Sequence, residues 1–132
     1  MGAGDQGRGA VRGLIDKPLL VDSITEAVGR GAGRLVVSGS HGGLSSARFA
    51  IETAPRLVVF NDAGMGKDAA GIAGLALLQT HGIAACTVAH TSARIGQAQS
   101  TLEDGVVSHA NGAAAALGVA PGRPLRQALS DL

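Results

Sequence analysis

Residues 34–62 read RLVVSGSHGGLSSARFAIETAPRLVVFND. Two short apolar runs, 35–37 and 57–60, enclose a segment at 45–53 that has helical composition and stops before a proline. The alternation continues with a helical segment at 67–80 and with apolar runs at 83–88 and 106–107. Short apolar runs that alternate with helices are typical of a buried parallel sheet. The sequence therefore predicts an α/β fold, a three-layer Rossmann- or flavodoxin-like domain with about four parallel strands in unknown order.

The rest of the chain extends this pattern in both directions. Residues 1–12 are half glycine and arginine, which predicts a flexible tail, and 13–132 are expected to form a single α/β domain. Residues 19–21 are expected to form an extended lead-in. Ser23 and Glu26 have the spacing of a capping box and so predict a short helix after it. Further helices are predicted to end near residue 104 and to span 112–117 and 123–132.

Composition excludes several classes of partner. The chain has 132 residues and a net charge of +1, with no basic stripe and only two aromatic residues. Binding of nucleic acid is therefore not expected, because it needs clustered positive charge or aromatic stacking platforms. No apolar run reaches the roughly 18 residues of a membrane span. A single cysteine cannot form an intramolecular disulfide. We expect a cytoplasmic protein with no nucleic-acid or membrane partner.

Polar residues cluster where each apolar run stops. Right-handed crossovers bring the carboxyl ends of parallel strands to one edge of a sheet, where ligands bind. The sequence thus predicts that four clusters, with three of the four histidines, meet at this edge: Ser38, Ser40, His41; Asn61, Asp62; His90, Thr91, Ser92; and Ser108, His109, Asn111. Serine, asparagine and aspartate also serve as helix caps and turn residues, so a structural role remains the alternative for each of them.

These clusters supply the candidate residues for a small-molecule site. The candidate catalytic residues are those that move or orient a proton: His41, His90, His109 and Asp62. The candidate substrate-binding residues offer backbone N–H groups at a helix start, hydroxyls, amides or cations: Ser40, Gly42, Gly43, Asn61, Gly64, Lys67, Ser92, Arg94 and Asn111. Ser40 or Ser92 acting as a nucleophile beside a histidine is an alternative.

No cofactor is expected. Residues 64–69, GMGKDA, match the letters G-x-G-x-x-A, but three residues separate them from the preceding apolar run, and His90 stands where an acidic ribose partner is expected. The same stretch fails as a P-loop because Asp68 follows Lys67. No local ligand spacing links the histidines, so a divalent metal held by them and Asp62 is a minor alternative. Cys86 lies inside an apolar run and is expected to be buried and unreactive.

Three functions follow, in order of preference. The first is a small-molecule enzyme of the hydrolase, lyase or isomerase class that uses histidine acid/base chemistry on a small polar or anionic substrate. The second is a non-catalytic module that binds a nucleotide or metabolite. The third is a structural subunit of a larger oligomer. Residues 69–78 are apolar on every side of a helix, which predicts burial on two sides: against another subunit of a homo-oligomer, as we expect, or within the core of one chain as the alternative.

Overall fold

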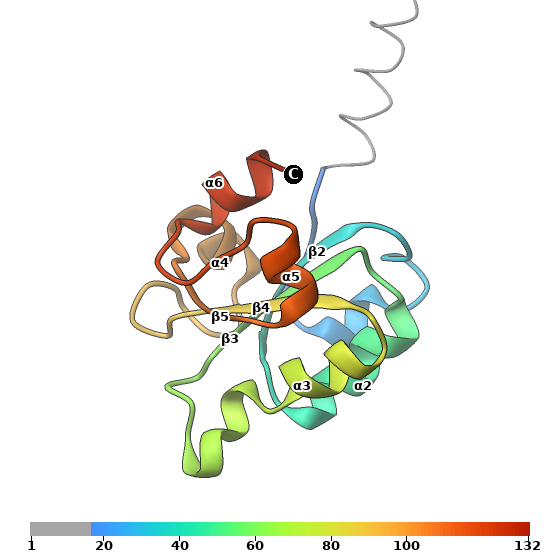
Figure 1. Cartoon of the computed structure of the whole chain (residues 1–132), viewed down its shortest axis with the longest axis horizontal. Coiled ribbons are helices and arrows are strands. Elements are labelled where there is room, and N and C mark those ends of the chain that lie inside the picture. Colours follow the sequence, from blue (N-terminus) through green and yellow to red (C-terminus); the bar gives the residue numbers. More distant parts are fainter. Residues whose placement is uncertain (1–16) are drawn as a thin grey trace, which may run out of the picture.

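A computed structural model describes residues 17–132, so the predicted tail at 1–12 lies outside the described residues. It contains a five-stranded sheet flanked by helices, which confirms the α/β prediction (Figure 1). The strands lie side by side in chain order: β1 Leu19–Val21, β2 Leu35–His41, β3 Leu57–Asn61, β4 Ala84–Val88 and β5 Val107–Ala110. The first four strands are parallel and β5 is antiparallel to β4.

The helices form two layers, one on each face of the sheet. One face is covered by η1 Ile24–Ala27, α2 Leu44–Thr53 and α3 Gly74–Thr80, and the other by α4 Ala98–Asp104, α5 Gly112–Ala116 and α6 Leu125–Ser130. Successive strand residues point to opposite faces, so each strand feeds both cores. Val58 and Phe60 pack toward the α2 and α3 layer, whereas Leu57 and Val59 pack toward the α5 and α6 layer. The predicted three-layer arrangement is therefore confirmed.

Two strands differ from the prediction. The expected lead-in at 19–21 pairs with β2 and is itself a strand, so the sheet has five strands. The last apolar run becomes β5, which starts only three residues after α4 ends. The connection from β4 to β5, residues 89–106, is long enough for a parallel crossover, but it returns the chain at the same sheet edge, and β5 runs antiparallel to its neighbour. Its carboxyl end therefore lies at the opposite edge from the ends of β1–β4.

The predicted helix at 67–80 is two elements rather than one. A 3₁₀ segment, η2 Lys67–Ile72, precedes α3, and Asp68 and Ala69 inside it have left-handed φ values of 56° and 58°. Leu75 and Leu78 of α3 are buried, whereas Ala76 is exposed. The segment is thus not one helix with apolar residues on all sides, and this argument for a homo-oligomer is wrong.

The connections after β3 and β4 leave toward opposite faces. The chain after β3 leads to α3 on one face, and the chain after β4 leads to α4 on the other. Neighbouring parallel strands whose connections diverge leave a crevice at their carboxyl ends, which is where α/β proteins bind ligands. Residues 89–97, the strap, run along this edge, and Gly96 N donates to Gly39 O of β2 at 2.7 Å. The fold therefore places a candidate site between the ends of β3 and β4.

Candidate functional site

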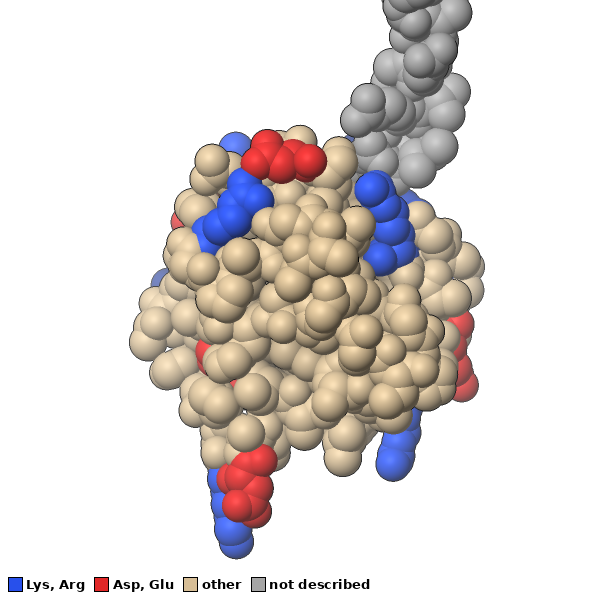
Figure 2. All heavy atoms as spheres, viewed as in Figure 1, with Lys and Arg blue, Asp and Glu red and all other residues tan. Residues whose placement is uncertain are grey.

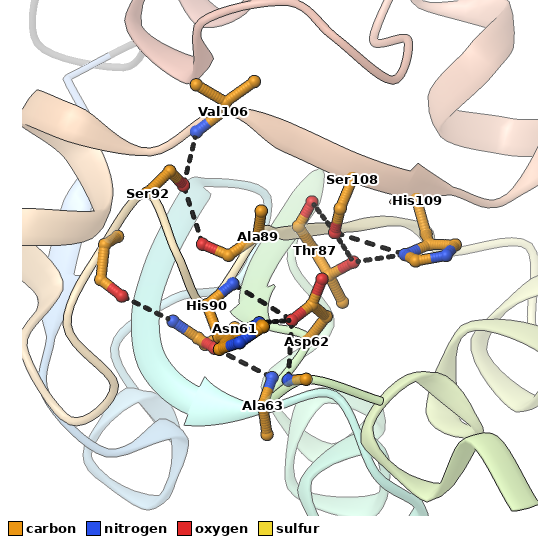
Figure 3. A network of polar contacts seen from close by, with 12 residues as sticks. Asn61, Asp62, Ala63, Thr87, Ala89, His90, Ser92, Val106, Ser108 and His109 are labelled. Carbon is orange, nitrogen blue, oxygen red and sulfur yellow. Dashed lines mark hydrogen bonds and ion pairs between the residues drawn. The ribbon is translucent and has the colours of Figure 1, made fainter. Parts of the chain in front are cut away.

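Asp62 and His90 face each other across this crevice (Figure 3). Asp62 follows β3 and is buried, whereas the His90 side chain, just beyond β4, is 56% exposed. Asp62 Oδ1 accepts hydrogen bonds from Gly64 N at 2.8 Å and His90 N at 3.0 Å, and it lies 3.4 Å from His90 Nδ1. An ionised carboxylate only accepts hydrogen bonds, so we assign the ring proton to Nδ1, which leaves Nε2 available to a ligand.

Several donors keep Asp62 ionised. Burial by itself would raise the pKa of this carboxyl group. The backbone N–H of Gly64, the Ser108 hydroxyl, the backbone N–H of His90 and the adjacent His90 ring outweigh burial, and the pKa of Asp62 is lowered. The site therefore holds a fixed negative charge directly behind an exposed imidazole.

A second polar group lies on the other side of Asp62. Ser108 Oγ is 2.8 Å from Thr87 Oγ1, and His109 Nδ1 lies 3.2 Å from Ser108 Oγ and 3.4 Å from Thr87 Oγ1 (Figure 3). Ser108 therefore stands between Asp62 and the third candidate histidine. Sequence reasoning gave Thr87 no role, although a polar residue inside a buried strand such as β4 is the signal that could have singled it out. Ser108 was grouped with the strand-end residues but was given no role.

A cavity of about 510 Å³ opens beside His90. We call it the His90 cavity; its walls come from the end of β3, the strap and α4, and its lining residues are Asn61, Ala63, His90, Thr91, Ser92, Ala93, Arg94, Ile95, Ser100 and Asp104. Among the predicted site residues, Asn61, His90, Ser92 and Arg94 lie around it. The cavity therefore combines an imidazole with charges of both signs.

His41 lies at the same sheet edge but in a neighbouring pocket. It ends β2, is paired in register with Asn61, and accepts a hydrogen bond from Gly43 N on Nδ1 at 3.0 Å. This second space, the His41 pocket, measures about 310 Å³ and is lined by His41, Ala63, Met65, Gly66, Ala70, Gly71 and Ile95. Ala63 and Ile95 line both spaces, so the two share a wall.

The predicted anion site at Gly42 and Gly43 lacks its donors. Gly42 N already donates to Asn61 O, and Gly43 N donates to the His41 ring. The expectation of free N–H groups on these two residues is therefore wrong. A Cβ on Gly42 would lie 2.7 Å from Gly71 O, and one on Gly43 would lie 2.8 Å from His41 Nδ1. Both glycines are explained by close packing of the segment before α3 against the start of α2.

Other predicted ligand-binding residues are engaged in holding loops. Asn61 is fully buried, and its side chain donates to Ala93 O of the strap and accepts from Ala63 N. Gly64 has a φ of +72°, which favours glycine, and donates to Asp62. Ser40 Oγ accepts from Ile24 N, and Ser92 Oγ joins Ala89 O to Val106 N. These contacts favour the structural alternative for Ser40, Asn61 and Ser92.

Two predicted residues lie away from both spaces. Lys67 is exposed at the start of η2. Figure 2 shows that charged side chains are sparse on the face in view, with no continuous basic patch. Lys67 lines neither the His90 cavity nor the His41 pocket. Asn111 follows the antiparallel β5 and lies at the opposite sheet edge, where it bonds to Ile83 O and Ala85 N. The expectation that Asn111 joins the other clusters is wrong because β5 runs in reverse.

Within residues 17–132, no group of three or more histidine, cysteine, aspartate or glutamate side chains has the geometry to hold a metal ion. In the same part of the chain, no helix is both long and apolar enough to cross a bilayer. Cys86 is fully buried, and this burial raises the pKa of its thiol to about 12, so it is protonated at neutral pH. The chain matches no family model, no curated protein and no solved structure.

Proposed function

We propose that this protein is a small-molecule enzyme of the hydrolase, lyase or isomerase class in which His90 transfers a proton to or from a substrate in the His90 cavity. The observation that supports this most is the contact between buried, ionised Asp62 and the exposed His90 ring at the crevice between β3 and β4. A carboxylate behind a histidine fixes the tautomer and orientation of the ring and stabilises the imidazolium that forms during proton transfer.

The neighbouring groups fit this role. Asp62 is itself held by two backbone N–H groups, so its carboxylate is fixed before any ligand arrives. Groups that are already oriented need little rearrangement in the transition state, which is how polar sites accelerate reactions. Arg94 at the cavity wall supplies a cation for the negative charge of a substrate. His90 is thus the proposed catalytic residue and Asp62 its positioning residue.

The test is turnover of a panel of small esters, phosphomonoesters, hydroxy acids and amino acids by the wild-type chain and by His90→Gln. A general acid or base contributes about 10²- to 10⁴-fold, so kcat on an active panel member should fall by that factor. His81→Gln is the matched control, because His81 is exposed at the carboxyl end of α3, away from the carboxyl edge of the parallel strands. The control should turn over the substrate like the wild type.

Unchanged turnover in His90→Gln would contradict the proposal. Binding of a panel member near His90 without any turnover would instead support the alternative of a non-catalytic binding module. Circular dichroism of each variant checks that the fold is retained.

A further inference from the structure

The His90 cavity carries two opposite charges that have no partner among the described residues. Arg94 and Asp104 both line the cavity, and both residues are exposed. Within residues 17–132 neither side chain forms a hydrogen bond or an ion pair, although the backbone N–H of Arg94 donates to Ser100. The cavity therefore offers one site for an anion and one for a cation.

Asp104 occupies an unfavourable position for a purely structural carboxylate. It is the last residue of α4, where the helix dipole disfavours negative charge, and α4 has no basic residue in its last turn. The side chain is exposed, and within the described residues no basic side chain pairs with it. A positively charged group bound in the cavity would provide that compensation.

The His41 pocket, in contrast, is mainly apolar. Its walls come from the loop after β3, from η2 and from Ile95 of the strap, and among them only His41 has a polar side chain. Ala63 and Met65, which line it, have left-handed φ values of 53° and 69°. Such conformations are costly for residues other than glycine, and strained residues of this kind cluster at ligand-binding sites.

We propose that the His90 cavity and the adjoining His41 pocket together bind a free aliphatic α-amino acid. Its carboxylate pairs with Arg94, its ammonium group pairs with Asp104, and its side chain enters the His41 pocket past Ala63 and Ile95. A zwitterion matches the paired charges of the wall, whereas an isolated anion or cation leaves one of them unmatched. The inference rests on the proposed function in one respect: it identifies the substrate class that lies beside His90.

The test measures binding by isothermal titration calorimetry near neutral pH with probes that differ by one group. The probes are L-leucine, 4-methylpentanoate, which lacks the ammonium group, 3-methylbutylamine, which lacks the carboxylate, and glycine, which lacks the side chain. L-Leucine should bind at least about 10-fold more tightly than each of the other three, since a tenfold difference corresponds to about 1.4 kcal/mol.

Variants assign each part of the ligand to its residue. In Arg94→Gln, leucine should bind no more tightly than 3-methylbutylamine, which lacks the carboxylate. In Asp104→Asn, leucine should bind no more tightly than 4-methylpentanoate, which lacks the ammonium group. Ala70→Leu, which fills the His41 pocket, should weaken leucine but leave glycine unchanged. Two controls, Arg126→Gln on α6 and Ala76→Leu on α3, alter exposed residues that line neither space and should bind leucine like the wild type.

Leucine that binds no better than 4-methylpentanoate, or that gives no binding heat at about 10 mM, would overturn the amino-acid inference. Turnover of another panel member through His90 by a chain that does not bind leucine would overturn this inference alone and leave the proposed function intact. Leucine binding as described, in a chain whose turnover is unaffected by His90→Gln, would support this inference and contradict the proposed function.

Discussion

Each of the two edges of the sheet carries a buried polar residue. Asn111 lies at one edge and is 8% exposed, and Asp62 lies at the other and is 5% exposed. Asn111 is fully used within the fold: Oδ1 accepts from two backbone N–H groups and Nδ2 donates to two carbonyl oxygens. Asp62 also binds backbone N–H groups, but it contacts an exposed imidazole as well. The comparison teaches that a polar group serves structure when its bonds end within the core, and can serve chemistry when they reach a solvent-facing group.

The largest effect is expected at Asn111, whose hydrogen bonds all end within the fold. Asn111→Ala removes four hydrogen bonds and leaves buried donors and acceptors without partners, at a cost of about 1–3 kcal/mol each where water cannot replace them. We expect the free energy of unfolding, measured by urea denaturation, to fall by about 3 kcal/mol or more. Any panel activity that survives should have the wild-type pH dependence. A loss of less than about 1 kcal/mol would show that the four hydrogen bonds of Asn111 do not hold this edge of the sheet together.

At the sheet edge that carries Asp62, Gly71→Ala is expected to lower stability and turnover more than any other small substitution. A Cβ on Gly71 would lie 2.0 Å from Asp62 O, so the loop after β3 must shift. Overpacking of this kind costs about 1–3 kcal/mol, and the shift should also separate Asp62 from His90 and lower turnover. Gly82→Ala is the control, because the space around that Cβ is open, Gly82 lines neither cavity, and only its left-handed φ of +69° is strained. Equal thermal stability and turnover of the two variants would contradict the packing argument.

A moderate effect is expected from pH. The pKa of Asp62 is lowered from its ordinary value of 3.8 in the folded chain. The folded state therefore favours the charged form, and the stabilisation is present above the ordinary value and is lost as pH falls through the lowered one. The difference in free energy of unfolding between the wild type and Asp62→Asn should thus shrink as the pH falls through the acid range. Urea denaturation at several pH values measures this; a difference that grows on acidification would have the wrong sign.

The smallest effect concerns backbone strain at Ala63, next to Asp62. Ala63 has a φ of 53°, and a left-handed conformation costs roughly 1–2 kcal/mol for residues other than glycine. Ala63→Gly should therefore leave the melting temperature unchanged or raise it slightly. Ala115→Gly, at an exposed position in α5, should cost about 1 kcal/mol, as expected in a regular helix. If both variants lose the same stability, Ala63 is not strained.

Much of the fold could be predicted from the sequence because apolar runs and capping residues act locally. The capping box of Ser23 and Glu26 forms as expected, and β2, β3 and β4 lie where the apolar runs predicted. The direction of β5 could not be predicted, because it depends on the edge of the sheet at which the connection through α4 brings the chain back to β4. The three residues of β1 are too few to distinguish a strand from an extended connection.

The site was harder to predict for a physical reason. The same side-chain types cap helices, bond to loops and bind ligands, so Asn61 and Asn111 looked alike in sequence. In the structure Asn61 bonds to Ala93 of the strap, whereas Asn111 bonds to Ile83 at the opposite edge of the sheet. Asp62 and His90 lie 28 positions apart, and only the diverging connections after β3 and β4 bring them together. Arg94 was predicted from its charge, whereas Asp104 lies at a helix end where no sequence signal marks it as a cavity residue.

The most direct test of the central claim, that Asp62 fixes His90 for proton transfer, is the tautomer of the His90 ring measured by ¹⁵N NMR on the neutral imidazole. We predict that the wild type carries the ring proton on Nδ1, because Asp62 Oδ1 accepts there. Asp62→Ala removes this acceptor, and the ring proton should then move toward Nε2, as in a free histidine side chain. His81 provides the internal reference in the same spectrum and should be unchanged by the substitution. A wild-type His90 protonated on Nε2, or a tautomer that Asp62→Ala leaves unaltered, would contradict the account.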